Sequence, residues 1–371
     1  MPNDRDPFIK ATWQGQDVST FVREAEIEDD DRLIDKAVIT FDDRVGAFTE
    51  GQTLTLELGW QNEHAVLFEG KVKEVESHAQ GQGAQRTHVT AYDLAWAMNH
   101  EAKTREFTSG TVSDAVRSIA GAYSVPVKTI HADPDPTLTE TSPERQVNVT
   151  DWVFLQELAR RHGARTYVEY NDGSSQFYFV DERTLVGAPV AGGLFWCGGR
   201  GPLIEFRARR GAAGAAPSVT ATATDPATGE TRTTTPDPVT SPPPLSASDA
   251  TTASTAGDPG AQAGLRSTLQ AAATATDHPQ DDVPARNTVG APSDPARAAI
   301  ATRRDLTRLL GLRADGLAVG TVHLRAKGTI HVAGVAGWAE GDWYVQRAVH
   351  TYRSASTGRN GTYQTRFIAT R

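Results

Sequence analysis

The single cysteine is the first residue to consider for chemistry. Cys197 follows Phe195 and Trp196 and precedes two glycines. A thiol nucleophile needs a base nearby, for which His162 and His350 are candidates. No feature of the sequence brings either histidine to the thiol, and a free cysteine is usually a small buried hydrophobe. We therefore interpret Cys197 as a buried structural residue.

The ten histidines do not form a recognisable metal motif. No pair stands at metal-ligand spacing on an expected helix. His323 and His331 fall on neighbouring expected strands, so a metal site there is an alternative to two histidines in a β-barrel wall. We predict no catalytic residue, no metal ligand and no cofactor.

Four further clusters have plain structural interpretations. The acidic runs lack the glycine and closing glutamate of a calcium loop and are expected to be solvated turns. The glycine-rich run lacks a following Lys-Ser or Lys-Thr, so it is not a phosphate loop. The arginine cluster is expected to be ordinary surface. These clusters are residues 28–31, residues 133–136, residues 187–193, and Arg207 with Arg209 and Arg210.

Composition and charge exclude several functions. The net charge is −9 and no basic stripe is present, so nucleic-acid binding has no electrostatic support. The seven tryptophans are dispersed, as core and interface anchors are, rather than grouped as a base-stacking platform. One cysteine excludes an intrachain disulfide. The N-terminal residues do not resemble a signal peptide, and no apolar run approaches the ~20 residues of a membrane span. We expect the chain to fold in the cytoplasm and to leave the cell only within a larger particle.

Residues 8–100 have the pattern of antiparallel strands. Leu54, Leu56, Leu58 and Trp60 alternate with polar or small residues, which is typical of a strand with one buried face. Further strands are expected at residues 37–41, 66–75 and 87–92.

Residues 105–210 are expected to form an α+β unit. Thr111 and Thr150 are suitable N-caps for two helices, and Asp114 and Asp151 suit the positive helix N-termini. The second helix is expected to end at Gly163. Strands are expected at residues 165–170 and 176–180, with a turn at residues 171–173, and residues 193–207 are expected to hold another strand.

The rest of the chain changes character twice. A weak hairpin is expected from residues 218–224 and 229–235, and then no periodicity survives between residues 236 and 292. Ser293 caps a helix, after which strands return. These strands are expected at residues 321–324, 329–335, 343–352 and 362–369, with Tyr363, Thr365, Phe367 and Ala369 on one face.

We therefore predict an α+β fold with two antiparallel, tube-like β-barrels side by side and an α/β insertion between them. The expected divisions are 1–104 for the first barrel, 105–210 for the insertion, 211–235 for a strand pair returning to the barrels, 236–292 for a disordered Ala/Thr/Pro-rich loop, and 293–371 for a helix and the second barrel.

Several motifs, in colinear order over some 300 residues by eye, resemble the phage late control D family of tail baseplate hubs, which is related to the hub part of type VI secretion spike proteins. The family usually has a tryptophan where this chain has Thr224, before the Asp-Pro turn. The motifs are residues 35–43 (DKAVITFDD), 51–58 (GQTLTLEL), 67–72 (LFEGKV), 90–94 (TAYDL), 148–159 (NVTDWVFLQELA) with Gly163, 222–230 (TATDPATGE), 341–345 (GDWYV) with His350, and Gly361, Tyr363, Thr365 and Phe367.

This resemblance implies a structural, non-enzymatic role in a contractile phage-tail-like injection particle. Family members carry two barrels per subunit, so a homotrimer presents six barrels to a six-fold inner tube and a three-fold face to a spike. The implied partners are the spike protein, the first ring of tube protein and the baseplate wedge components, without nucleic acid and without membrane insertion. The particle is a phage or another injection system, possibilities that the sequence leaves open.

Two alternatives remain open at this stage. A tail-associated cell-wall hydrolase would need a fused domain of well over ~50 residues, and only residues 236–292 are long enough. A glycan-binding adhesin built of β domains would be a monomer or a flexible tandem, whereas the hub interpretation predicts a trimer.

Overall fold

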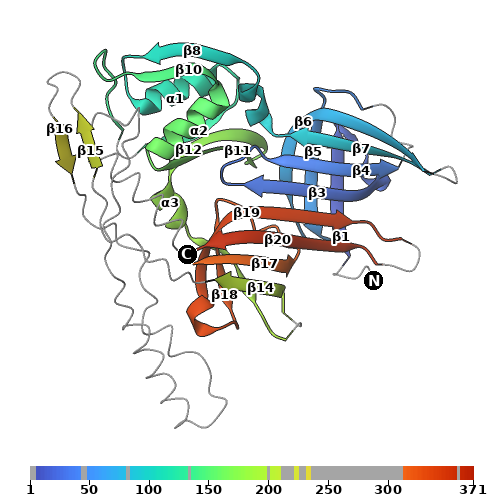
Figure 1. Cartoon of the computed structure of the whole chain (residues 1–371). Coiled ribbons are helices and arrows are strands. Elements are labelled where there is room, and N and C mark those ends of the chain that lie inside the picture. Colours follow the sequence, from blue (N-terminus) through green and yellow to red (C-terminus); the bar gives the residue numbers. More distant parts are fainter. Residues whose placement is uncertain are drawn as a thin grey trace, which may run out of the picture.

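The computed structural model describes residues 6–42, 48–80, 84–132, 135–198, 201–209, 221–224, 231–234, 312–356 and 360–371. The fold is rich in strands and has a few helices (Figure 1). The expected loop at 236–292 and the helix after Ser293 lie outside the described residues. Within the described ranges, no helix is both long enough and apolar enough to cross a bilayer.

The N-terminal β region is a run of antiparallel strands with one buried face. Leu54, Leu56 and Leu58 are fully buried, which confirms the strand predicted from their alternation. Gly51 has φ +82°, a turn conformation suited to glycine, just before that strand. The elements are β1 (Pro7–Trp13), β2 (Gln16–Asp17), the 3₁₀ turn Ser19–Phe21, β3 (Val22–Asp30), β4 (Lys36–Asp42), β5 (Thr53–Trp60), β6 (Glu63–Gln80) and β7 (Ala84–Tyr92).

The C-terminal β region combines strands from before and after residues 210–311. Tyr363, Thr365, Phe367 and Ala369 are all buried, so the face predicted for the last strand is confirmed. The elements are β13 (Val190–Phe195), β14 (Leu203–Arg209), β17 (Arg313–Val319), β18 (Thr329–Ala333), the 3₁₀ turn Gly337–Ala339, β19 (Gly341–Arg353) and β20 (Thr362–Thr370).

The prediction that residues 193–207 hold a strand is confirmed, since they contain the end of β13 and most of β14, with Gly198 at φ +53° in the turn between the two strands. One strand prediction in this region is wrong. Residues 321–324 are a turn, in which the Thr321 hydroxyl accepts a hydrogen bond from the His323 amide at 3.3 Å. Such a local side-chain bond competes with strand pairing.

The two β regions are joined by strand pairing into one 13-stranded sheet. In the described part of the chain its main order is β14-β17-β20-β19-β3-β4-β7-β6-β5-β1-β2, and β18 pairs with β13 and β19. The junction is antiparallel pairing of β19 with β3, which matches Arg347 with Asp30 and Arg353 with Glu24. Figure 1 shows the red C-terminal strands continuing directly from the blue strands.

Each β region has its own apolar core. The N-terminal core contains Phe41 and the β5 leucines, and the C-terminal core contains Trp343 and Phe367. Tyr352 and Tyr363 come from the C-terminal strands but pack in the N-terminal core. The two regions therefore share apolar contacts as well as backbone hydrogen bonds.

Residues 94–186 form a third, separately cored unit, here called the insertion. Thr111 and Thr150 cap α1 and α2 as predicted, and Gly163 after α2 has φ +61°. Trp152 and Leu155 lie in its core. The elements are the 3₁₀ helix η4 (Leu94–Asn99), β8 (Ala102–Phe107), α1 (Val112–Gly121), β9 (Val127–His131), β10 (Glu144–Thr150), α2 (Asp151–Arg161), β11 (Ala164–Asn171), β12 (Ser174–Asp181) and α3 (Glu182–Val186).

The weak hairpin is also present. β15 (Ala221–Thr224) and β16 (Thr231–Thr234) pair with each other in antiparallel fashion. They form a separate two-stranded sheet within the described residues.

Candidate functional site

Cys197 does not lie in a core, so the prediction of a buried structural cysteine is wrong. The thiol is exposed, at the turn after β13, and Trp196 beside it is also exposed. Both candidate bases are buried elsewhere. His350 bonds the Tyr363 hydroxyl at 2.9 Å, and His162 lies 3.6 Å from a carboxylate oxygen of Glu144 in the insertion. Both histidines are thus buried, whereas the thiol is on the surface.

The two histidines considered for metal binding have separate carboxylate partners. His323 Nε2 lies 2.8 Å from Glu63 Oε1, and His331 Nδ1 lies 2.7 Å from Asp342 Oδ1. The first pair links the loop after β17 to the start of β6. Among the residues described, no group of three or more His, Cys, Asp or Glu side chains is arranged to hold a metal ion.

The acidic run at residues 28–31 is mostly a buried ionic site, so its interpretation as a solvated turn is wrong. Asp29 and Asp31 are 1% and 3% exposed. An unpaired buried carboxylate is costly, and each of these two has cationic partners. The partners come from the insertion and from the loop at residues 320–328, far away in sequence.

Lys327 is the centre of this site, which we call the ionic junction. Its Nζ lies 2.6 Å from Asp29 Oδ1, 3.3 Å from Asp35 Oδ2 and 3.9 Å from Glu169 Oε2. The ammonium also lies 5.0 Å from the centre of the Tyr167 ring. Burial alone would lower the pKa of Lys327, but these carboxylates outweigh burial and hold the pKa well above its ordinary value.

The backbone at Lys327 is in an unusual conformation for a residue with a side chain. Its φ is +67°, in the left-handed region. The amide donates to the Val345 carbonyl at 2.9 Å, and Val345 donates back to Gly328 at 2.9 Å. The surrounding contacts therefore over-determine this conformation and aim the ammonium into the junction.

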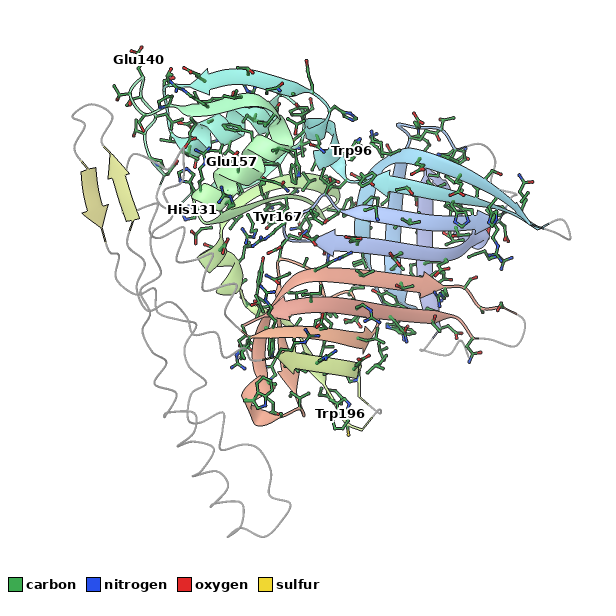
Figure 2. All side chains as sticks on the ribbon, viewed as in Figure 1. Trp96, His131, Glu140, Glu157, Tyr167 and Trp196 are labelled. Atoms are coloured by element: carbon green, nitrogen blue, oxygen red, sulfur yellow. The ribbon has the colours of Figure 1, made fainter. Side chains whose placement is uncertain are left out.

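Two arginines complete the junction. Arg325 lies 3.3 Å from Asp29 and 2.7 Å from Glu169, and also donates to the Leu67 carbonyl at 3.2 Å. Arg165 of β11 lies 3.2 Å from Asp31, which directly follows β3, and 2.6 Å from Glu182 of α3. All three parts of the molecule thus meet at one charged site. Figure 2 shows Tyr167 at this meeting place, between the insertion and the sheet.

The carboxyl groups of the junction do not titrate alike. Burial raises the pKa of Asp29, but Lys327 and Arg325 outweigh this effect, so the net pKa is lowered. Burial raises the pKa of Asp93 to about 7 and that of Asp35 well above its ordinary value. Asp93 accepts backbone hydrogen bonds from Ala95 at 2.7 Å and Asp35 at 3.1 Å. The neighbouring charge of Asp93 raises the pKa of Asp35 further, so we assign the tightly held proton to the pair.

A second polar cluster stabilises the insertion itself. Asp151, the buried first residue of α2, accepts from Lys103 at 2.8 Å, Tyr123 at 2.6 Å and Gln146 at 2.9 Å, and also pairs with Arg105. Burial raises the pKa of Asp151, but these donors outweigh it and the net pKa is lowered. The cluster fixes α2 against β8 and β10.

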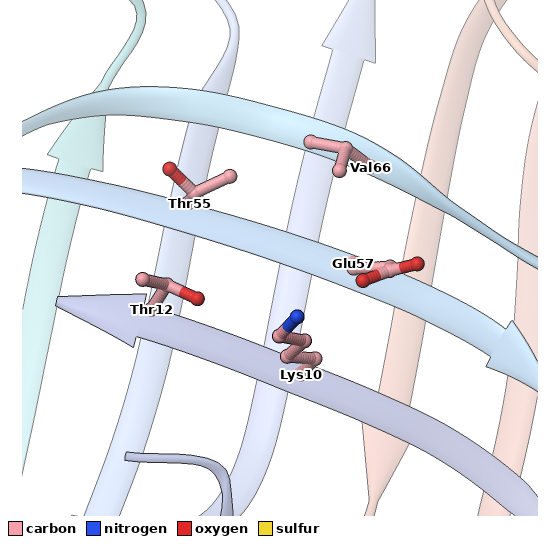
Figure 3. Close-up of a pocket in the computed structure, with 5 residues that line it drawn as sticks. All are labelled: Lys10, Thr12, Thr55, Glu57 and Val66. Atoms are coloured by element: carbon pink, nitrogen blue, oxygen red, sulfur yellow. The ribbon is translucent and has the colours of Figure 1, made fainter. Parts of the chain in front are cut away.

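A small hollow lies on the outer face of β1, β5 and β6 (Figure 3). It has a volume of about 180 Å³ and is lined by Lys10, Thr12, Thr55, Glu57 and Val66. Lys10 and Thr12 stand opposite Glu57 and Thr55 in the strand register. Ligand pockets usually measure roughly 300–1,000 Å³. This hollow is therefore a gap between cross-strand neighbours.

Exposed apolar side chains mark two surfaces. Phe195, Trp196 and Trp338 are 54%, 46% and 40% exposed. Phe195 pairs with the last residue of β18, and Trp338 lies in the following turn, so the three share one end of the C-terminal region. Figure 2 shows Trp196 at the end of the molecule away from the insertion. Leu33 and Val153 are also exposed, close in sequence to Arg32 and Gln156, where the Gln156 amide of α2 donates to the Arg32 carbonyl.

A family comparison decides the class of protein. The model described as phage tail baseplate hub (GPD) matches residues 43–356, most of the chain. The chain belongs to the phage tail baseplate hub family. The resemblance seen in the sequence is confirmed, and the chain is a structural hub-family component of a phage tail or tail-like particle.

Solved structures share the hub fold at low sequence identity. The tail protein of Neisseria meningitidis MC58 aligns with a TM-score of 0.65 and 14% identity, over 99% of this chain and 97% of its own. The 43 kDa tail protein of prophage MuSo2 from Shewanella oneidensis aligns with a TM-score of 0.64 and 9% identity, over 98% of both chains. A type VI secretion component of E. coli, the c3393 protein, aligns with a TM-score of 0.58 and 11% identity, over 97% of this chain and 76% of its own. A search of curated protein sequences finds no match.

Proposed function

We propose that this hub-family chain assembles as a homotrimer that adapts a six-fold inner tube to a three-fold spike. In this role it contacts the spike protein, the first ring of tube protein and the baseplate wedge components. It transmits the thrust of sheath contraction to the spike and needs no catalytic group. The chain assembles in the cytoplasm and is released only with its particle.

The pairing of β3 with β19 carries this proposal. It fixes two β regions, each with its own core, side by side in a single subunit. If each region forms one tube-like barrel, three subunits supply six equivalent positions, the number that a six-fold tube ring requires. The third unit, the insertion, lies outside this continuous sheet and leaves it available for the ring.

The outer strands support a closed ring. In the described part of the chain, the sheet path ends at β14 on one side and at β1 with β2 on the other. A cyclic assembly joins one surface of a subunit to a different surface of the next, so two distinct ends are what it needs. Exposed strand edges are otherwise prone to uncontrolled pairing.

The related proteins support the same particle. The E. coli c3393 protein is described as a type VI secretion component with structural similarity to the T4 tail proteins gp27 and gp5. The Neisseria and Shewanella relatives are described as tail proteins. A hub that receives a spike is consistent with both kinds of particle.

The decisive experiment is a mass measurement combined with co-purification. Light scattering after gel filtration should give about three times the 39.8 kDa chain mass. Co-expression with the neighbouring tube and spike genes should yield a complex whose electron micrographs show a six-fold ring over a three-fold spike. A monomer that binds neither protein would overturn the proposal. Turnover of purified peptidoglycan would instead favour the hydrolase, and glycan binding by a monomer would favour the adhesin.

A further inference from the structure

The insertion contacts the sheet mainly through polar groups. Ser175 of β12 donates to Glu69 of β6 at 2.9 Å, and Arg165 pairs with Asp31 at 3.2 Å. Arg325 reaches across to Glu169 at 2.7 Å. The apolar part of this contact is a small cluster formed by Tyr167, Val180, Leu185 and Tyr344.

The insertion does not depend on that contact for a core of its own. Its helices and strands enclose Trp152, Phe154, Leu155 and Phe177 without help from the sheet strands. Contacts between domains that are small and polar generally permit relative motion. A mostly ionic contact between two separately cored units is therefore a joint whose strength depends on its charges.

The charges of the ionic junction do not balance. The six carboxylates of Asp29, Asp31, Asp35, Asp93, Glu169 and Glu182 outnumber the four cations Arg32, Arg165, Arg325 and Lys327. Asp93 accepts its hydrogen bonds from the backbone amides of Ala95 and Asp35, and Asp35 shares Lys327 with the nearer Asp29. The Asp35–Asp93 pair therefore has the least compensation. The groups around this pair are Asp29 and Asp30 of β3, Asp31 and Arg32 directly after β3, Arg325 and Lys327 of the 320–328 loop, Arg165, Tyr167 and Glu169 of β11, Glu182 of α3, and Tyr344 and His350 of β19.

We propose that the ionic junction is a proton-dependent lock, which fixes the insertion on the sheet while the Asp35–Asp93 pair holds a proton and loosens it when both carboxylates are ionised. With the proton bound, Lys327 serves Asp29, Asp35 and Glu169 together. When the proton leaves, a further buried negative charge appears beside Asp29 with no new cation to meet it. This unfavourable charge is solvated when water enters between β11 and the 320–328 loop, and the entry of water separates the insertion from the sheet.

His350 does not compensate for the lost proton. Burial lowers its pKa to about 4, and the nearby Arg325 guanidinium acts in the same direction, so it is neutral over the relevant range. The pKa of Asp93, at about 7, places the change near neutral pH. The proposed lock is therefore closed in mildly acid solution and loosened in mildly alkaline solution.

Hydrogen exchange on the full chain tests this proposal whether or not the chain is a trimer. Protection factors, which divide out the intrinsic pH dependence of exchange, are compared at about pH 6 and about pH 8.5, on either side of the transition. Peptides from β11 and from residues 320–328 should lose about tenfold in protection at the higher pH, because one proton is released over about one pH unit below the folded pKa, while peptides from β5 should not change. Equal protection of the junction at both pH values would refute the lock.

Three variants sharpen the test. Asp93→Asn removes the titrating carboxylate, so the pH effect in β11 should largely disappear. Lys327→Met should leave the junction poorly protected at both pH values. Asp342→Asn changes an exposed carboxylate paired with His331 and should behave like the parent chain. If Lys327→Met does not fold, the comparison of Asp93→Asn with the parent chain still tests the proposal. A full pH effect on protection in Asp93→Asn would contradict it.

Discussion

Trp343 and Lys327 lie in the same C-terminal region but are buried in opposite ways. Trp343 is fully buried among apolar side chains, and its indole donates to the Ala339 carbonyl at 2.9 Å. Lys327 is also buried but is enclosed by carboxylates. Apolar burial stabilises without regard to charge, whereas a buried ion pair recovers its desolvation cost only with good geometry. The core therefore makes the β regions stable, and the ionic junction holds the insertion against them.

The largest expected effect is in the apolar core. Trp343→Ala should lower the free energy of unfolding by roughly 3–5 kcal/mol, because it leaves a cavity that cannot collapse fully. The loss should be similar at mildly acid and mildly alkaline pH. Urea unfolding measures it, with Trp338→Ala as the matched control. Trp338 is an exposed indole, so its loss should stay within about 0.5 kcal/mol.

The next effect concerns the ionic junction. Lys327→Met should cost roughly 3 kcal/mol, because the carboxylates of Asp29 and Asp35 remain buried without their main cation. Arg353→Met removes an exposed pair with Glu24 and should cost less than about 1 kcal/mol. Chemical denaturation of both variants checks the contrast, and similar losses would mean that the junction is no stronger than a surface pair.

The pH dependence of stability should separate the two regions further. Since Asp93 has a pKa of about 7 in the folded chain and 3.8 ordinarily, the folded state holds the proton more tightly. Stability should therefore fall as pH rises between these values, by at most about 1.4 kcal/mol per pH unit for one proton. The lowered pKa of Asp29 acts in the opposite sense, so stability is also lost as pH falls through its folded value.

Denaturant midpoints measured across this pH range report both the loss of stability as pH rises toward 7 and the loss of stability as pH falls through the pKa of Asp29. Asp93→Asn should remove the loss of stability that the parent chain shows as pH rises toward 7. It should keep the loss that the parent chain shows in acid, where Asp29 is protonated. A parent chain whose midpoint does not change between about pH 4 and about pH 8 would contradict the assignment of the proton to this pair.

The smallest expected effect is local to the insertion. Thr150 caps α2 by accepting from the Val153 amide at 3.3 Å, so Thr150→Ala should cost about 1 kcal/mol. Thermal unfolding of this variant is compared with that of Thr108→Ala, an exposed threonine just after β8. A cap contributes to one helix only, so the ionic junction should keep its hydrogen-exchange pattern in Thr150→Ala.

Local patterns of sequence were sufficient for much of the fold. The alternation of Leu54, Leu56 and Leu58 depends on the geometry of one strand, and the caps at Thr111 and Thr150 depend on one helix turn. Each pattern involves residues within a few positions of one another, so the sequence alone predicts them. The colinear family motifs added the class of protein, which no single element determines.

The ionic junction was not predictable in the same way. Arg325 and Asp29 are 296 positions apart, and only tertiary structure brings them together. The same polar pattern that marks a solvated turn also marks a buried network when its partners are distant. The sequence contains one indication of a buried ionic site, since the charged residues Asp35 and Lys36 stand at the start of an otherwise apolar strand. It does not indicate which residues pair with them. Cys197 was misplaced for a related reason, because its exposure follows from the turn at Gly198.

The pairing of β3 with β19 has a consequence for synthesis on the ribosome. Arg353 and its neighbour Glu24 are 329 positions apart, and translation adds roughly 5–20 residues per second. One edge of β3 therefore emerges long before its partner exists, and the N-terminal region waits with that edge unsatisfied for tens of seconds. We expect nascent chains truncated before β19 to require chaperone protection, and full-length chains to be released from it as their last strands emerge.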